Sequence, residues 1–157
     1  MQINIFNSAN FLLEGLGCKK DIPRAIKLYE EAAQRGELAS LYALSTLYET
    51  GAEGVPQNLE KAFELCQKSA DLGYLRSQCR LGLIYDFGWH GIAKNDALAF
   101  KYYKIAAEAG DSDSQFNLGN MYLSGASSCP PDLEKAMHWF KKSSDQGLRI
   151  VYFDFFL

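Results

Sequence analysis

Glycine recurs in this chain at a fixed interval of 37 residues, at Gly36, Gly73, Gly110 and Gly147. Three other columns keep the same interval: Ala25, Ala62, Ala99, Ala136; Tyr29, Cys66, Tyr103, Phe140; and the small pairs Ala32-Ala33, Ser69-Ala70, Ala106-Ala107, Ser143-Ser144. A regular period of about 20 to 50 residues is typical of repeat architectures, in which each copy is one supersecondary unit. The chain is therefore predicted to consist of four copies of a single unit.

The second half of each copy is predicted to be an amphipathic helix. A short polar side chain precedes it and can accept hydrogen bonds from the unpaired N–H groups of the first turn. These predicted N-caps are Asp21, Asn58, Asn95 and Asp132. The alanine, bulky and small-pair columns then recur at i, i+4 and i+7/i+8, which places them on one apolar stripe. The glycine ends the helix, because the residue after a helix often adopts the left-handed conformation.

The first half of each copy is predicted to be a second helix with one apolar face. The matching residues are Ser40, Leu44, Leu47, Tyr48; Ser77, Leu81, Ile84, Tyr85; and Ser114, Leu118, Met121, Tyr122. A small residue follows the leucine at Ser45, Gly82 and Gly119, where we expect a neighbouring helix to approach closely. The predicted fold is an all-α solenoid of antiparallel helix pairs, a single domain over 1–157. Its repeats are 1–36, 37–73, 74–110 and 111–147.

These motifs resemble those of the Sel-1-like repeat family, a relative of the tetratricopeptide repeats. The shared features are small-x-x-x-Leu-Gly-x-x-Tyr-x-x-Gly, a Gly-Val loop, Asp/Asn-x-x-x-Ala and Ala-Ala-x-x-Gly, and residues 77–110 match best. The resemblance covers nearly the whole chain. It implies a right-handed superhelix of paired antiparallel helices, and the role of a non-catalytic adaptor that holds other proteins together.

Residues 148–157, LRIVYFDFFL, depart from the polar surface that a terminal repeat normally presents. They begin like the first helix of a fifth repeat, and they are apolar on every side. Such a segment needs cover on the face that does not pack against the fourth repeat. We expect either self-association of two chains through this segment or continuation of the native protein into further repeats.

Composition excludes several classes of partner. The 157 residues are 48% hydrophobic, enough for a substantial core, and the net charge of -3 lacks the basic character that nucleic-acid binding requires. No apolar run approaches the roughly 18 residues of a membrane-spanning helix. The N-terminus has no basic start and is interrupted by Asn4, Asn7 and Asn10, so it is a poor signal peptide. We expect a cytoplasmic protein without a membrane span.

The four cysteines are predicted to be reduced. Cys18 and Cys129 occupy a loop column filled elsewhere by Val55 and Ile92, which predicts burial as small apolar side chains. They lie three repeats apart, too far for a disulfide at about 9 Å per helix layer. Cys66 and Cys79 flank a helix turn and form the only plausible pair. A secreted, cysteine-rich branch of the family carries cysteines at other places of this turn, which here hold Ala70 and Gln78.

No residue pattern indicates catalysis, a cofactor or a metal site. His138 falls in an exposed helix column and His90 in a variable loop column, and zinc-type spacings are lacking. Two rival functions remain open. One is a small hydrolase that uses a thiol or a histidine, because such residues need only meet in space. The other is a regulatory fragment of a larger protein whose catalytic domain is absent from this chain.

The first helices carry a line of residues opposite their core face that is too apolar for ordinary solvated surface. These candidate protein-binding residues are Tyr42, Thr46, Glu49, Cys79, Leu83, Asp86, Phe116, Asn120 and Leu123. One interpretation is that they pack against the first helix of the next repeat. The other is that they border a concave groove for a peptide or partner helix. On the second interpretation, the chain is a protein-protein interaction scaffold.

Overall fold

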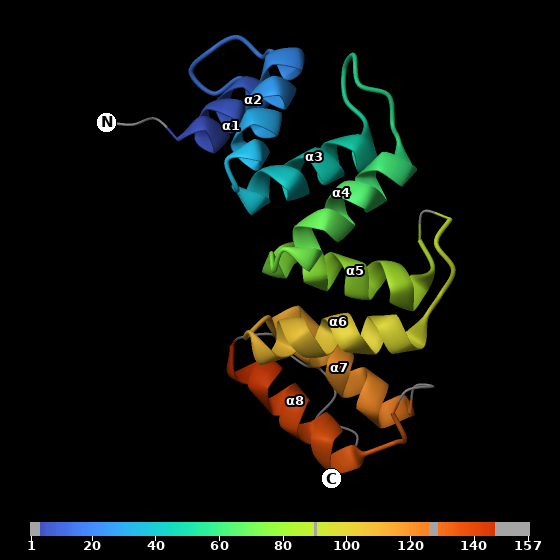
Figure 1. Ribbon diagram of the computed structural model, residues 1–157. Helices are drawn as coiled ribbons and strands as arrows, with labels where there is room; N and C mark the ends of the chain where they lie inside the picture. Colours follow the sequence, from blue (N-terminus) through green and yellow to red (C-terminus); the bar gives the residue numbers. More distant parts are fainter. Residues whose placement is uncertain (1–3, 90, 126–128, 147–157) are drawn as a thin grey trace. The chain divides into compact units, whose positions relative to one another are not determined.

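The computed structural model describes residues 4–89, 91–125 and 129–146, and over these residues the chain is helical (Figure 1). Its only extended pairing there is an isolated bridge between Ala52 and Val55. The eight helices within the described residues are α1 Ile5–Glu14, α2 Ile22–Gln34, α3 Leu38–Thr50, α4 Leu59–Asp71, α5 Leu75–Phe87, α6 Asp96–Glu108, α7 Ser112–Ser124 and α8 Leu133–Asp145. The prediction of an all-α helical repeat protein is confirmed.

The chain divides into two compact units, residues 1–77 and 78–157. The first unit holds α1 to α4, with α2 packed on both α1 and α3, and α4 packed on α3. Helix α5 begins in the first unit and continues into the second, where α7 packs on both α6 and α8. In each unit a helix thus contacts the helix before it and the helix after it, which is the nearest-neighbour packing of repeat proteins.

Side-chain caps start the second helix of every repeat. In each case the Oδ1 atom of the cap accepts a hydrogen bond from the backbone N–H three residues later, at 2.9 to 3.0 Å. The four pairs are Asp21 with Arg24, Asn58 with Lys61, Asn95 with Leu98, and Asp132 with Lys135. The predicted starts of these helices are confirmed.

The repeat glycines end the second helices in a conformation that disfavours other residues. Gly36, Gly73 and Gly110 have φ angles of 88°, 93° and 98°. A side chain at such an angle brings its Cβ atom close to the backbone, so glycine is strongly preferred there. The predicted helix stops are confirmed for these three copies, and Gly147 lies outside the described residues.

The small residues of the first helices allow the close helix approach that the sequence predicts, and large rings from the second helices fill the space. A Cβ atom built on Gly82 would lie 2.5 Å from Cδ1 of Tyr103, and one on Gly119 would lie 2.6 Å from Cε1 of Phe140. The Tyr103 side chain is only 1% exposed, and it forms a cluster with Leu118 and Met121. The glycines therefore set the close spacing between paired helices of the second unit.

One burial prediction is wrong. Cys129 and Val55 are 7% and 8% exposed, but Cys18, in the same column, is exposed to solvent. The reason is the missing neighbour: Val55 packs in a cluster with Ile22, which belongs to the preceding copy. No described residue of the chain supplies the same cover to Cys18, whose thiol instead donates a hydrogen bond to the Phe11 carbonyl oxygen.

Some of the predicted features lie outside the described residues. The segment 148–157, expected to self-associate, lies outside the described residues, as does His90. Among the described residues, no helix is both long enough and apolar enough to cross a lipid bilayer.

Candidate protein-binding surface

The nine candidate residues lie on the first helices of repeats two to four, three on each of α3, α5 and α7. Within each helix they are spaced at i, i+4 and i+7, so each set of three shares one helix face. The α3 set belongs to the first unit, and the α5 and α7 sets belong to the second. Their surroundings differ from helix to helix.

The α5 set is engaged in packing within the second unit. Leu83 packs against the cluster that contains Tyr103 and Leu118. The Asp86 carboxylate accepts a hydrogen bond from the Tyr103 hydroxyl at 3.2 Å, and the Lys94 ammonium lies 4.0 Å from its other oxygen. Both side chains are half-buried. Most of this helix face is therefore covered by the chain itself.

Cys79, the third member of the α5 set, faces the start of α7. Burial raises the pKa of its thiol to about 12, with the Ser114 hydroxyl opposing that shift and the nearby Asp111 carboxylate adding to it. The Asp111 side chain also caps α7 by accepting from the Ser114 N–H at 2.7 Å. Cys79 is consequently a protonated thiol at neutral pH, since its pKa lies far above 7.

The α3 and α7 sets mix packed and exposed residues. Tyr42 lies 5.7 Å from Tyr74 between ring centroids, and Phe116 lies 5.6 Å from Phe140. Glu49 is half-buried, and its carbonyl oxygen accepts from the Gln57 side chain at 2.8 Å. The exposed members are Thr46, Asn120 and Leu123.

Leu123 is the large apolar member of this exposed group, with 51% of its surface accessible. Asn120 precedes it by one turn and is also exposed, while Leu118 on the opposite side of α7 is fully buried. Helix α7 thus presents an exposed leucine and amide to solvent. The role of these residues in binding stays a prediction.

The four cysteines are all described, and none of them forms a disulfide. Cys66 is buried and its thiol donates to the Ser77 carbonyl oxygen at 3.7 Å, while the buried Cys129 donates to the Met121 carbonyl oxygen at 3.5 Å. Neither the burial of these two thiols nor the raised pKa of Cys79 suits a nucleophile, which must be an accessible thiolate.

We expect Cys18 to react with iodoacetamide well before the other three cysteines. An exposed thiol is open to the reagent, whereas burial shields Cys66 and Cys129, and at Cys79 it also raises the pKa of the thiol. Peptide mapping by mass spectrometry after a short exposure, in the native state and in denaturant, measures the order of labelling. Early labelling of Cys79 in the native state would contradict the raised pKa of its thiol.

His138 does not meet a nucleophile in the described structure. It lies exposed on α8, with its ring 5.3 Å from the ring of Trp139 in an edge-on arrangement. Across the described residues, no group of three or more His, Cys, Asp or Glu side chains is placed to hold a metal ion.

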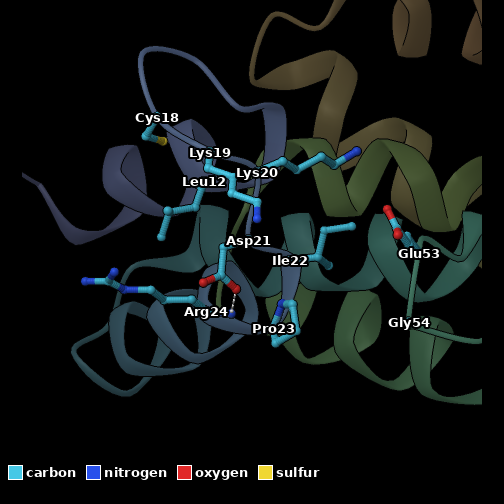
Figure 2. A pocket seen from close by; sticks show the side chains of 10 residues that line it. All are labelled: Leu12, Cys18, Lys19, Lys20, Asp21, Ile22, Pro23, Arg24, Glu53 and Gly54. Carbon is cyan, nitrogen blue, oxygen red and sulfur yellow. Dashed lines mark hydrogen bonds between the residues drawn. The ribbon is translucent and has the colours of Figure 1, made fainter.

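An open cavity of about 640 Å³ lies beside the loop that joins α1 to α2 (Figure 2). Its lining residues come from α1, this loop, the first turn of α2 and the loop after α3: Leu12, Cys18, Lys19, Lys20, Asp21, Ile22, Pro23, Arg24, Glu53 and Gly54. All of them belong to the first unit. The repeat pattern does not predict this cavity, although the adjacent Lys19 and Lys20 mark the loop as basic.

The repeat sequence itself identifies the family. The Sel1 repeat pattern matches four times, at residues 5–37, 38–74, 75–111 and 112–148. The chain belongs to the Sel1 repeat family. Proteins of this family are generally protein-interaction scaffolds and are typically non-catalytic. No curated protein sequence matches the chain as a whole.

Solved Sel1 repeat structures resemble the chain along most of its length. A protective antigen of uropathogenic Escherichia coli, described as having an SLR fold, is 31% identical with a TM-score of 0.77, over 91% of this chain and 30% of that one. A Sel1 repeat protein of Oxalobacter formigenes is 29% identical with a TM-score of 0.75, over 91% of this chain and 56% of that one. The chain thus spans about a third to a half of the length of these two.

The cysteine rich protein B of Helicobacter pylori shares the fold at lower identity. It is 24% identical with a TM-score of 0.60, and the match covers 83% of this chain and 91% of that one.

Proposed function

We propose that this Sel1 repeat protein is a non-catalytic scaffold that binds a partner protein or peptide through the first helices of its repeats. The observation that carries the proposal is the exposed face of α7, where Leu123 is 51% accessible and the neighbouring Asn120 is exposed. Exposed apolar side chains rimmed by polar ones are typical of protein interaction sites. Thr46 holds the position on α3 that Asn120 holds on α7.

The state of the cysteines and of His138 supports this function over a thiol hydrolase. A nucleophilic cysteine needs a depressed pKa or an adjacent base. The pKa of Cys79 is instead raised to about 12, and Cys66 and Cys129 are buried. His138 contacts an aromatic ring. These surroundings favour a binding role.

Changing the exposed members of the line to lysine should abolish partner capture and leave the fold intact. The variant is Thr46→Lys, Asn120→Lys and Leu123→Lys, three exposed helix positions where substitution shifts stability by about 0.5 kcal/mol or less. Tyr42, Leu83 and Phe116 are unsuitable for this test, because each contacts other parts of the chain. Capture on beads from an extract of the source cell, followed by mass spectrometry, measures the outcome.

The matched control variant introduces the same three lysines at exposed positions of the second helices. Gln34→Lys, Met137→Lys and Ser144→Lys are also exposed helix positions, and this variant should retain the partners of the native protein. Equal capture by both variants would show that the first-helix surface is not the binding surface. An extract in which the native protein enriches no partner would count against the scaffold role itself.

A further inference from the structure

The cavity beside the α1–α2 loop carries three exposed cations whose side chains lack carboxylate partners. They are Lys19, Lys20 and Arg24, and no ion pair within the described chain involves any of them. Other exposed lysines, such as Lys27 and Lys141, also lack an ion pair in the described chain, so these three cations differ in that they line one cavity. Comparison with the other repeats shows which carboxylates could have paired with them.

Lys20 lacks the carboxylate partners that the corresponding lysine of the third repeat has. Lys94 holds the same position in the third repeat, where its ammonium lies 3.3 Å from the Asp96 carboxylate and 4.0 Å from that of Asp86. In the first repeat, the aliphatic Ile22 occupies the position of Asp96. Leu13 occupies that of Asp86, because Gly15, which ends the first helix of this repeat, precedes Gly51 by 36 residues and not 37. The first repeat therefore has the lysine but has neither of the two carboxylates that pair with it in the third repeat.

Arg24 has cationic counterparts in the second and fourth repeats, Lys61 and Lys135, whereas Lys19 has none. Arg24 corresponds to Lys135, whose ammonium pairs with Asp132 at 2.8 Å. The equivalent Asp21 caps α2 through its Oδ1 atom, just as Asp132 caps α8, but the Arg24 guanidinium extends away from Asp21 (Figure 2). Lys19 corresponds to Pro56, Ala93 and Pro130, which carry no charge.

The arrangement of the cations indicates the shape of an anionic ligand. The side chains of Lys19, Lys20 and Arg24 leave the backbone in different directions and do not converge on one point (Figure 2). Three separated charges suit carboxylates spaced along an extended chain better than one compact anion such as phosphate. Leu12, Ile22 and Pro23 line the same cavity and offer apolar contact between the charges.

We propose that this cavity binds an acidic, extended segment of a partner protein, with aliphatic residues between its carboxylates. The proposal rests on the scaffold function and adds a second contact surface to the one on the first helices. The cavity also holds the carboxylates of Asp21 and Glu53. Three cations against these two carboxylates leave a net charge of +1 in the cavity lining.

Fluorescence anisotropy with a labelled synthetic peptide tests the proposal on the full chain. The probe has about eight residues of alternating Glu and Leu, which in extended form spans about 26 Å. Its matched control replaces every Glu by Gln. We expect the Glu peptide to bind, the Gln peptide to bind at least about tenfold more weakly, and the affinity to fall as salt shortens the screening length.

Two variants with the same loss of charge locate the site. Lys19→Gln, Lys20→Gln and Arg24→Gln should weaken binding of the Glu peptide by about tenfold or more. Lys27→Gln, Lys104→Gln and Lys141→Gln change exposed cations elsewhere and should leave it within about twofold.

Three results would overturn the proposal: equal affinity of both peptides, an unchanged affinity in the cavity variant, or displacement of the peptide by inorganic phosphate as efficiently as by unlabelled peptide. The last would indicate a small-anion site. The first-helix variant described above distinguishes failure of this proposal from failure of the scaffold function. Peptide binding lost only in that variant would refute the cavity and leave the scaffold standing.

Discussion

The Gly82→Ser variant should lower the free energy of unfolding by about 1 to 3 kcal/mol, the usual cost of overpacking a filled core. Its Cβ atom would lie 2.5 Å from Cδ1 of the Tyr103 ring, which is buried and would have to shift. The better helix propensity of serine offsets at most about 0.5 kcal/mol of this cost. Urea unfolding followed by tryptophan fluorescence measures the effect, because both tryptophans, Trp89 and Trp139, belong to the second unit.

A second substitution should restore part of this loss. The second repeat has Ser45 and Cys66 at the positions of Gly82 and Tyr103, and both of those residues are buried. Tyr103→Cys alone should cost about 2 to 5 kcal/mol by opening a cavity. The double variant should cost less than the sum of the single variants, because serine fills space that the ring vacates. Additive losses would show that the two residues do not share that space.

Leu118→Ala should lower the free energy of unfolding by about 2 to 5 kcal/mol, the range for truncating a fully buried leucine. Leu118 is 0% exposed and lies in the cluster with Ala99, Tyr103 and Met121. Trp139 packs against this cluster, so its fluorescence should report the loss directly. Urea titration with m-values compared between variants measures the change.

Leu123→Ala is the matched control on the same helix. Its side chain is 51% exposed, so the expected change in the free energy of unfolding is about 0.5 kcal/mol or less. A loss at Leu123 as large as that at Leu118 would mean that the exposed face of α7 is covered in solution. That outcome would support a packed surface there and weaken the case for an open binding face.

Sequence periodicity predicts most of the local structure correctly, for identifiable reasons. The caps at Asp21, Asn58, Asn95 and Asp132 act on N–H groups three residues away, and such local contacts need no knowledge of the tertiary fold. The glycine stops at Gly36, Gly73 and Gly110 are equally local, because they depend on the backbone angle of one residue. The close approach at Gly82 and Gly119 follows from the repeat, since residues 21 positions further along occupy matching columns.

The candidate surface is less predictable, because the same helical spacing places packed and exposed residues on one line. Leu83 and Leu123 lie in the same predicted line, yet one packs against a core cluster and the other is exposed. Which neighbour covers a given position depends on the helices packed beside it, and the spacing of residues along one helix carries no record of those neighbours.

The sequence by itself determines the repeat, the helix ends and the family of this protein, because each depends on residues close together or at a fixed interval. The tertiary structure decides which side chains of a repeated column are buried, and which charged side chains find a partner on another helix. Cys18 is exposed although Val55 in the same column is buried, since only Val55 packs with a preceding copy. Lys20 and Lys94 are the same residue in the same column, and one of the carboxylates that distinguish them, Asp86, lies on α5 and approaches Lys94 only through the fold.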